Sequence, residues 1–486
     1  MNPLLLTDGY KVDHRRQYPE GTTLVYSNWT PRKSRISGVD EVVFFGLQYF
    51  IKKYILEDFD TYFFKQPKTK VVEEYARIIN NYLGDNQVGT KHIEDLHDLG
   101  FIPMIIKALP EGSCVPVRVP MFTIYNTRPE FFWLTNYFET LLSAIIWMPC
   151  TSATIAKQYH KILIKYAEET SSNTEFVNWQ GHDFSMRGMS GMEAGITSAA
   201  GHLLSFTGTD TIPALIFFEK YYNANSDTEL IGGSVPATEH SVMSMGTFEN
   251  EFSTFKRLIC DIYPNGIVSI VSDTWDLWKV LTEYLPKLKF EISNRSGKVV
   301  IRPDSGDPAD IICGNLSGKT ENEKKGVIEL LWETFGGQIN TKGYKELIPQ
   351  IGAIYGDSIT IERAIEICER LKAKGFASTN VVLGIGSYTY QFNTRDTFGF
   401  AMKATYGEVN GVGREIYKDP VTDDGTKKSA KGLIKIEFEN GQYQLKDQVD
   451  WNEEKTGELK IVFKDGKLLI DQSLAEIRAR LNHDYE

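Results

Sequence analysis

Acidic side chains follow three apolar segments that are each typical of a buried β-strand. IVSIV leads to Asp273, VVIRP to Asp304 and IGAIYG to Asp357. Carboxylates at strand ends suit Mg²⁺, which keeps several waters and binds through a few carboxylates and substrate phosphates. They also suit ribose hydroxyl groups, and spacing does not separate the two uses. Arg302 and Asp304 alone could be a structural ion pair, but the recurring acids favour a binding site.

A glycine-rich turn offers a second kind of chemistry, phosphate binding. Gly384, Gly386 and Ser387 follow the apolar segment VVL, and Arg395 comes soon after. Backbone N–H groups approach an anion closely in such a turn, although two glycines are more often just a tight turn. Basic residues concentrate nearby in a chain of net charge −11, either as a phosphate-binding cluster or as a solvated face: Lys403, Arg414, Lys418, Lys427, Lys428 and Lys431.

Two histidines stand in polar motifs. His240 follows Glu239 in GGSVPATEHS, and His182 begins HDFSMRG. A lone histidine is more often a structural residue than a catalyst, and the residues alone leave both readings open.

The whole chain narrows the class of protein. Its excess of acidic residues argues against general binding to nucleic acid or anionic membranes. The five cysteines are scattered without a CxxC pair, which favours reduced thiols. Polar residues interrupt the most apolar window, 131–148, so we expect a buried helix there and no membrane span. The N-terminus lacks a basic leader before an apolar stretch, so we expect no signal peptide. These features predict a cytoplasmic protein.

The elements that position these groups alternate between strand and helix after residue 151, as in parallel βα units. Apolar spacing predicts a helix from Ile361 to Leu371. Ligands bind at the carboxyl ends of such strands. We expect a mixed α+β region in the first 150 residues, with helical stretches at 42–56 and 131–148. Hairpin turns at 440–441 and 465–466, and a capping box at 473–476, indicate a β-rich end with a last short helix.

Ten motifs in order, from near residue 4 to near residue 432, resemble the nicotinamide phosphoribosyltransferase family. They are LLTDGYKVDHRRQYP, FFGLQY, FFWLTNYFETLL, HDFSMRG, GTDT, GGSVPATEHS, VSDTWD, IRPDSGDP, GIGSYTYQFNTRDTFGFAMKAT and YKDPVTDDGTKKSAKG. The resemblance implies an α/β protein with an irregular α/β barrel of the type II phosphoribosyltransferase kind, at 151–395. A second α+β domain would form from both chain ends, 1–150 with 396–486. It also implies a homodimer with shared active sites.

The resemblance implies a role for each side of a nicotinamide ring. Phe184 would stack on one face and Tyr10 of the partner subunit on the other. Asp210 would accept from the carboxamide, helped by Arg302 and Ser269. A carboxylate there would repel nicotinate.

The resemblance also implies a larger set of groups that would bind the phosphate, ribose and pyrophosphate parts of a phosphoribosyl substrate. They are Asp8, Arg32, Arg187, Arg302, Asp304, Gly356, Asp357, Gly384, Gly386, Ser387, Arg395 and Lys403. Mg²⁺ would bind near Asp304 and Asp273, mainly through phosphates and water. Two departures from the family, Ala401 in place of a serine and the turn GIGSYTY, predict altered phosphate affinity.

The resemblance also implies that ATP phosphorylates His240, oriented by Glu239 and Asp273, with Lys418 and Lys427 on the ATP phosphates. His240, Glu239, Asp273 and Asp304 would then be the catalytic residues, with Mg²⁺ as cofactor and ATP as co-substrate.

The implied activity joins nicotinamide to 5-phosphoribosyl 1-pyrophosphate, giving nicotinamide mononucleotide and pyrophosphate in NAD salvage, with stimulation by ATP. Three alternatives stay open. Nicotinate phosphoribosyltransferase shares the fold, and Asp210 argues against it. A non-enzymatic nucleotide-binding signalling dimer would not need the catalytic groups, and a metal-dependent barrel hydrolase would not need the aromatic and lysine motifs.

Overall fold

The computed structural model describes residues 1–84, 86–417 and 430–483, and the chain divides into two compact units. Unit 1 comprises Met1–Thr154, Phe217–Ala224 and Asn393–Glu486. Unit 2 comprises Ile155–Ile216 and Asn225–Phe392. Sequence had suggested 1–150 with 396–486 against 151–395. The structure also assigns the short segment Phe217–Ala224 to the unit that contains both chain ends.

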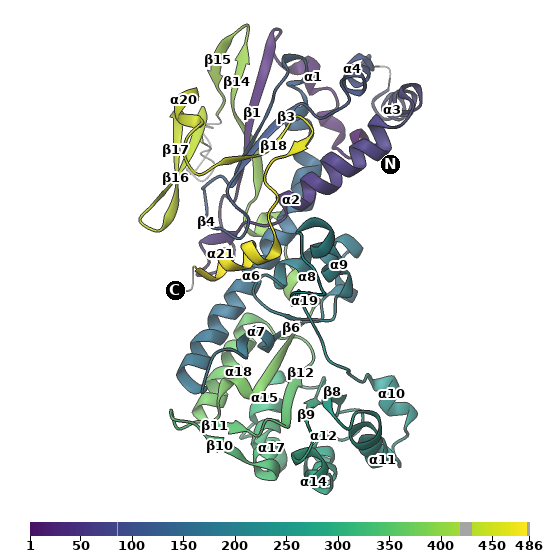
Figure 1. The fold of residues 1–486 in the computed structure, drawn as a ribbon, viewed down its shortest axis with the longest axis vertical. Coiled ribbons are helices and arrows are strands. Elements are labelled where there is room, and N and C mark those ends of the chain that lie inside the picture. Colours follow the sequence, from purple (N-terminus) through teal and green to yellow (C-terminus); the bar gives the residue numbers. More distant parts are fainter. Residues whose placement is uncertain (85, 418–429, 484–486) are drawn as a thin grey trace. The chain divides into compact units, whose positions relative to one another are not determined.

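Unit 2 is built on a six-stranded sheet in which all neighbouring strands are parallel (Figure 1). Its order is β7 (Gly208–Thr209), β6 (Gly181–Asp183), β13 (Val381–Ile385), β12 (Ile351–Tyr355), β9 (Gly297–Arg302) and β8 (Gly266–Val271). The four apolar segments read as strands are β8, β9, β12 and β13, so that prediction is confirmed. Because the strands are parallel, their carboxyl ends lie at one edge of the sheet.

An irregular segment joins the two outer strands of this sheet. Gly233 forms a parallel bridge with Gly208 beside β7, and Ala237 forms one with Ser269 of β8. Ser269 N–H donates to the Pro236 carbonyl over 2.9 Å. Pro236 has no N–H of its own to return a ladder bond, so no regular strand forms there. These contacts curl the sheet into the irregular α/β barrel that the resemblance implied.

Helices of unit 2 pack against the strands and against each other. They include α15 (Pro308–Cys313), α17 (Val327–Phe335) and α18 (Ile361–Ala373). In α18 the buried residues Ala364, Ile367, Cys368 and Leu371 form one face, and the Thr360 hydroxyl caps the first turn by accepting from Arg363 N–H. The predicted helix at this position is confirmed.

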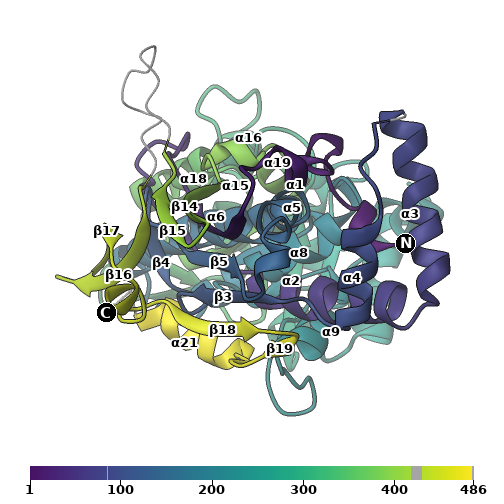
Figure 2. The same ribbon diagram turned by 90° about the horizontal axis from the view of Figure 1, so that it is seen from above.

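Unit 1 contains a seven-stranded antiparallel sheet to which both chain ends contribute. The order is β15 (Val412–Glu415), β14 (Ala401–Val409), β1 (Thr22–Thr30), β5 (Phe122–Asn126), β3 (Met104–Ala108), β18 (Lys460–Lys464) and β19 (Lys467–Leu468). The yellow C-terminal strand β18 pairs with the blue β3 (Figure 2). This pairing confirms the prediction of an α+β region formed from both ends of the chain.

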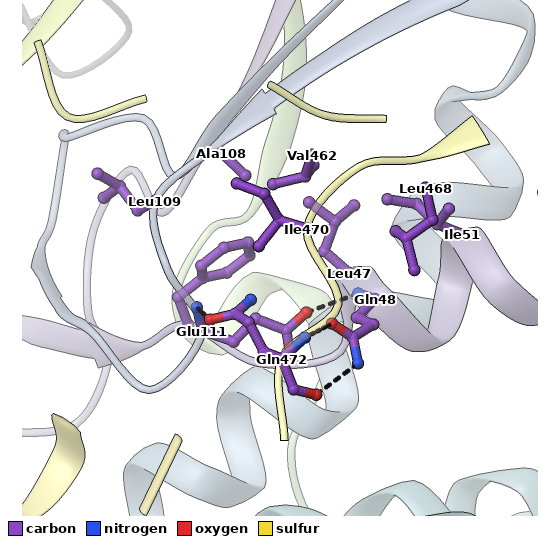
Figure 3. Close-up of a pocket in the computed structure, with 11 residues that line it drawn as sticks. Leu47, Gln48, Ile51, Ala108, Leu109, Glu111, Val462, Leu468, Ile470 and Gln472 are labelled. Carbon is purple, nitrogen blue, oxygen red and sulfur yellow. Dashed lines mark hydrogen bonds between the residues drawn. The ribbon is translucent and has the colours of Figure 1, made fainter. Parts of the chain in front are cut away.

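A buried polar cluster ties the C-terminal segment to the N-terminal part of unit 1 (Figure 3). Gln472 N–H donates to Gln48 Oε1 over 2.7 Å, and Gln48 Nε2 returns a bond to the Gln472 carbonyl over 2.8 Å. Glu111 accepts from Gln48 N–H over 2.6 Å, and its own N–H donates to Gln472 Oε1. The adjoining cavity of about 10 Å³ is too small for a metabolite, so this cluster is structural.

The local turn predictions also have clear outcomes. The hairpin β16 (Leu433–Glu439) to β17 (Gln442–Val449) turns at 440–441, and β18 to β19 turns at 465–466. All four turn residues have positive φ, as two-residue hairpin turns require. Ser473 and Glu476 form the predicted capping box of α21 (Leu474–His483).

One helical stretch was predicted correctly only from Leu47 onwards. Residues 42–56 begin as strand β2 (Glu41–Val43), and helix starts only at α2 (Leu47–Phe50), continuing as a π-helix over Ile51–Asp58. Gly46, at φ 106°, separates the two elements because only glycine adopts that backbone comfortably. Apolar content alone did not show this break.

The apolar window 131–148 is helical, in α5 (Leu134–Tyr137) and the start of α6 (Glu139–Thr170). Within the described ranges, no single helix has the length and apolar composition of a membrane span. The segments Pro129–Tyr137 and Glu139–Thr170, bent by 43°, meet that criterion only when taken together.

Candidate active site

A cavity of about 280 Å³ lies inside the barrel of unit 2. Side chains at alternate strand positions line it, as strand geometry requires: Ile267 and Ser269 from β8, and Val300 and Arg302 from β9. His182, Phe184, Asp210 and Ser234 line it too. The cavity therefore brings together four residues that the resemblance assigned to a nicotinamide site, Phe184, Asp210, Ser269 and Arg302.

An aromatic and charged cluster surrounds Phe184. The His182 ring centroid lies 4.5 Å from that of Phe184, with the planes tilted by 38°. The Arg302 guanidinium carbon lies 5.6 Å from the Phe184 centroid. A flat, uncharged ring entering the cavity would therefore meet an aromatic face beside hydrogen-bond donors.

Asp210 is an ionised acceptor in this cavity. Burial by itself would raise its pKa, but hydrogen bonds from His182 and Ser234 and the charge of Arg302 outweigh burial, and the pKa of Asp210 is lowered. The carboxylate is therefore negatively charged at neutral pH.

A second carboxylate, Asp183, fixes the backbone around Asp210. It is fully buried, and its Oδ2 accepts from the hydroxyls of Thr209 and Thr211, each over 2.8 Å. Its Oδ1 accepts from the Ser185 N–H and hydroxyl. The loop that carries Phe184 and the turn that carries Asp210 are thus held by one side chain.

Several polar atoms at this end of the barrel have no hydrogen-bond partner. They are Ser269 Oγ, Arg302 Nε, Asp273 Oδ1 and Asp304 Oδ1, all buried. A buried polar atom without a partner costs about 1–3 kcal/mol, and native structures contain few of them. Their clustering around one cavity and its strand-end edge indicates a site shaped for a polar ligand.

At two glycines on the strand-end edge, neighbouring atoms leave no space for a side chain. A Cβ at Gly356 would lie 1.9 Å from Asp304 Oδ1, and one at Gly384 would lie 2.6 Å from the Tyr355 carbonyl oxygen. Asp357 follows Gly356 and is exposed, and Gly386 and Ser387 lead into the short helix α19 (Ser387–Gln391). Arg187 is exposed in the turn Met186–Gly188. The predicted phosphoribosyl residues of unit 2 therefore come from the ends of β6, β9, β12 and β13.

The acids fit a metal only in part. Asp273 Oδ2 already accepts from the N–H groups of Asp304 and Ser305, over 2.8 and 2.7 Å. Asp273 Oδ1 and Asp304 Oδ1 are without partners. In the part of the chain that the structure describes, no group of three His, Cys, Asp or Glu residues could hold a metal ion. The two free oxygens suit a cation whose other ligands are phosphate and water.

His240 begins α10 (His240–Met245), and its neighbours differ from those expected. Its Nδ1 lies 3.3 Å from Thr274 Oγ1, and its Nε2 lies 3.8 Å from Asp304 Oδ2. The Glu239 carboxylate instead accepts from the Ser241 hydroxyl, and Asp273 Oδ2 binds backbone. Glu239 and one oxygen of Asp273 are thus engaged locally, while Asp273 Oδ1 has no partner, so orientation of His240 by these two carboxylates stays a prediction.

Unit 1 carries the remaining predicted residues, several of which form a basic cluster. Burial and the positive charges of Arg32, Lys11 and Arg395 lower the pKa of Lys403, although Glu139 opposes this. Burial is the largest of these causes, and Lys11 is itself paired with Glu139. Arg32 Nε donates to the Gly399 carbonyl, so its position is fixed.

The other predicted residues of unit 1 lie at the N-terminus. Tyr10 is 63% exposed, and its ring centroid lies 4.9 Å from Lys11 Nζ and 5.2 Å from the His14 ring centroid. Asp8 Oδ2 accepts from the Thr140 hydroxyl over 2.7 Å. Ala401 is buried at the start of β14. Lys418 and Lys427 lie outside the described residues.

Sequence reasoning missed four residues around these sites: Lys11, Asp183, Ser234 and Thr274. Three of them stand inside the quoted motifs DGYK, HDFSMRG and VSDTWD, and Ser234 stands in GGSVPATEHS. Membership of a motif was thus the available signal, but nothing in spacing showed which side chain each residue contacts.

Known proteins resemble this chain in sequence and in fold. A family model described as the nicotinate phosphoribosyltransferase (NAPRTase) family matches residues 179–466. A second, described as the nicotinamide phosphoribosyltransferase N-terminal domain, matches residues 2–103. Two solved structures, the nicotinate-nucleotide pyrophosphorylase from Pyrococcus furiosus and the human nicotinic acid phosphoribosyltransferase, each give a TM-score of 0.56. They are 14% and 15% identical and cover 99% and 98% of this chain, and 95% and 93% of their own, so they show a shared fold.

Two curated relatives are much more similar in sequence. The nicotinamide phosphoribosyltransferase of Acinetobacter baylyi is 54% identical, covering 100% of this chain and 98% of that protein. The nicotinamide phosphoribosyltransferase of Mycoplasma pneumoniae is 38% identical, covering 88% of this chain and 94% of that protein. With the ten motifs and the barrel cavity, these matches show that the chain belongs to the nicotinamide phosphoribosyltransferase family.

Proposed function

We propose that this protein joins nicotinamide to 5-phosphoribosyl 1-pyrophosphate and releases nicotinamide mononucleotide and pyrophosphate. The observation that carries the proposal is the barrel cavity. It places the Phe184 ring beside an ionised acceptor, Asp210, and two buried groups without partners, Ser269 Oγ and Arg302 Nε. Nicotinamide supplies what this arrangement lacks: a flat ring, an N–H donor for Asp210 and a carbonyl acceptor for Ser269 or Arg302.

Asp210 favours the amide over the acid. It accepts a hydrogen bond from the carboxamide nitrogen, whereas the carboxylate of nicotinate would bring a second negative charge. Unit like charges ~4 Å apart repel by about 4 kcal/mol at an effective dielectric of about 20, roughly a thousandfold in affinity. Nicotinamide is therefore the proposed substrate and nicotinate the disfavoured one.

The strand-end edge receives the phosphoribosyl group. Arg302, Asp304, Gly356 and Asp357 bind the ribose and pyrophosphate side, with Arg187 and the turn at Gly384, Gly386 and Ser387 adding donors. Arg32, Arg395 and Lys403 supply positive charge for phosphate, and Asp8 belongs to the same predicted set of phosphoribosyl-binding residues. Ala401 offers no side-chain donor, so phosphate affinity rests on these groups.

The transfer breaks the bond between the ribose C1 and the pyrophosphate oxygen and forms one from C1 to the nicotinamide ring nitrogen. The ribose passes through an oxocarbenium-like state, as glycosyl transfers do. Asp210 and Phe184 hold the ring so that its nitrogen faces C1. Asp273 and Asp304 would hold Mg²⁺, whose charge would stabilise the departing pyrophosphate.

Coupling to ATP is a further part of the proposal. His240 is exposed enough to accept a phosphoryl group, and Asp304 and Thr274 lie near its ring nitrogens. Lys418 and Lys427 bind the ATP phosphates in this proposal. The active form is a cytoplasmic homodimer in which Tyr10 of the partner subunit covers the second face of the nicotinamide ring.

The test is direct. Purified protein is incubated with phosphoribosyl pyrophosphate and Mg²⁺, with nicotinamide or nicotinate, and with or without ATP, and the mononucleotide is quantified. We expect product from nicotinamide, little from nicotinate, and more with ATP. An Asp210→Asn variant should lower the ratio of amide to acid turnover by up to about a thousandfold. Preferential use of nicotinate would favour the nicotinate enzyme, and absence of either product a non-enzymatic role.

A further inference from the structure

Two hydrogen bonds hold Asp210, and both reach the same carboxylate oxygen. His182 Nε2 lies 2.9 Å from Asp210 Oδ1, and the Ser234 hydroxyl donates to that atom over 2.7 Å. An ionised carboxylate only accepts hydrogen bonds, so His182 Nε2 carries the hydrogen. Among the residues that the structure describes, none donates a hydrogen bond to Asp210 Oδ2.

The backbone of Asp210 is fixed separately from its side chain. Asp210 N–H donates to the Asp183 carbonyl over 3.0 Å, and the Asp183 carboxylate binds the hydroxyls on either side, at Thr209 and Thr211. With Cα fixed, the remaining freedom of Asp210 is rotation of its side chain. His182 comes from β6 and Ser234 from the segment that closes the barrel, so two barrel elements stop this rotation.

We propose that His182 and Ser234 are positioning residues that hold Asp210 by Oδ1 and so leave Oδ2 as the acceptor for the nicotinamide carboxamide. The inference rests on the proposed function and deepens it. A carboxylate held in this way presents a fixed charge to the substrate, so it binds an N–H donor well and rejects a second carboxylate. A freely rotating Asp210 would do both less well, because it could turn its charge away from nicotinate.

A purely structural role for His182 is the competing explanation, since its ring also contacts Phe184 at 4.5 Å. Two substitutions separate the roles. His182→Phe keeps an aromatic ring beside Phe184 and removes the N–H donor. His182→Gln removes the ring but keeps an N–H donor on a side chain of similar length.

Ser234→Ala is a smaller change than the His182 substitutions, and it has a matched control. Ser234 is exposed, so Ser234→Ala should leave the fold intact. Ser172 lies elsewhere in unit 2, is also exposed, and donates to Glu346 Oε2 over the same distance, 2.7 Å. Ser172→Ala therefore removes an equivalent hydrogen bond away from the cavity.

The experiment uses the full-length enzyme with saturating phosphoribosyl pyrophosphate. For each variant, KM and kcat are measured with nicotinamide, and nicotinate is titrated as a competitive inhibitor. We expect His182→Phe to raise the nicotinamide KM about tenfold with kcat changed less than about threefold, and Ser234→Ala to raise KM about threefold. Both should bind nicotinate more tightly relative to nicotinamide. His182→Gln should restore most of the selectivity, and Ser172→Ala should match the parent.

The opposite pattern would overturn the inference. One such result is that His182→Phe and Ser234→Ala keep the parent's preference for nicotinamide over nicotinate, and another is a lower kcat with an unchanged KM. Either result would mean that His182 and Ser234 do not position Asp210. If His182→Phe fails to fold, Ser234→Ala and His182→Gln decide by the same criterion. A parent enzyme that makes no mononucleotide from nicotinamide would instead remove the proposed function itself, a result visible before any variant is compared.

Discussion

Replacing Gly356 by alanine should disable the phosphoribosyl side of the site without unfolding the barrel. Gly356 follows β12 and is buried against two polar atoms that have no partners, Asp304 Oδ1 and Arg302 Nε. An added Cβ would lie 1.9 Å from the first and 2.9 Å from the second. Both atoms belong to residues that we propose to bind phosphoribosyl pyrophosphate.

The required displacement follows from these distances. Real Cβ atoms essentially never approach closer than 3.0 Å, so Asp304 Oδ1 must move by about 1.1 Å from its position at 1.9 Å. A misplacement of about 1 Å in a catalytic group can lower the rate about a hundredfold. Overpacking of this kind costs about 1–3 kcal/mol of stability, which a unit of this size should tolerate.

The assay is kcat/KM for phosphoribosyl pyrophosphate, together with thermal unfolding. Gly195→Ala is the control, because Gly195 lies inside α8 (Met192–His202). Its added Cβ would lie 3.2 Å from the flexible Met186 side chain, and its distances to the Met186 backbone, 3.5 Å and more, are ordinary contacts. Alanine there should stabilise the helix by up to about 1 kcal/mol. We expect Gly356→Ala to lose about a hundredfold in kcat/KM and Gly195→Ala to lose little. A Gly356→Ala enzyme within threefold of the parent would refute the steric reasoning.

Three further predictions concern other parts of the chain. His240→Ala should abolish stimulation by ATP and retain basal transfer, and equal stimulation in variant and parent would contradict a phosphohistidine. Lys107→Met should cost about 3–5 kcal/mol in denaturant unfolding, because it leaves the Glu454 carboxylate, 1% exposed and 2.9 Å from Lys107 Nζ, without its cation. Burial lowers the pKa of His92 to about 3, so the stability it contributes is present above about pH 6.5 and lost as the pH falls towards 3. Unfolding should therefore be about 2 kcal/mol easier at pH 5 than at pH 8, and a His92→Phe protein that shows the same loss would argue against this origin.

Local patterns in the sequence were enough for the strands of the barrel and for the groups at their ends. β8, β9 and β12 are apolar segments followed by Asp273, Asp304 and Asp357. Both the burial of each strand and the polar residues at its end can be recognised within a few residues of sequence. The hairpin turns and the α18 face were predictable for the same reason. The break at Gly46 was missed because apolar content does not distinguish a strand from a helix over a short segment.

The tertiary structure decided which of these groups contact one another. His182 lies 28 residues before Asp210, Ser234 lies 24 residues after it, and Thr274 lies 34 residues after His240. Side-chain alternation fixes which face of a strand a residue occupies, but it carries no information about the partner across the barrel. That partner is set by strand order and by the irregular segment that closes the sheet. For this reason the residue types of the site could be read from the sequence, whereas the shared oxygen of Asp210 and the neighbours of His240 emerged only from the folded barrel.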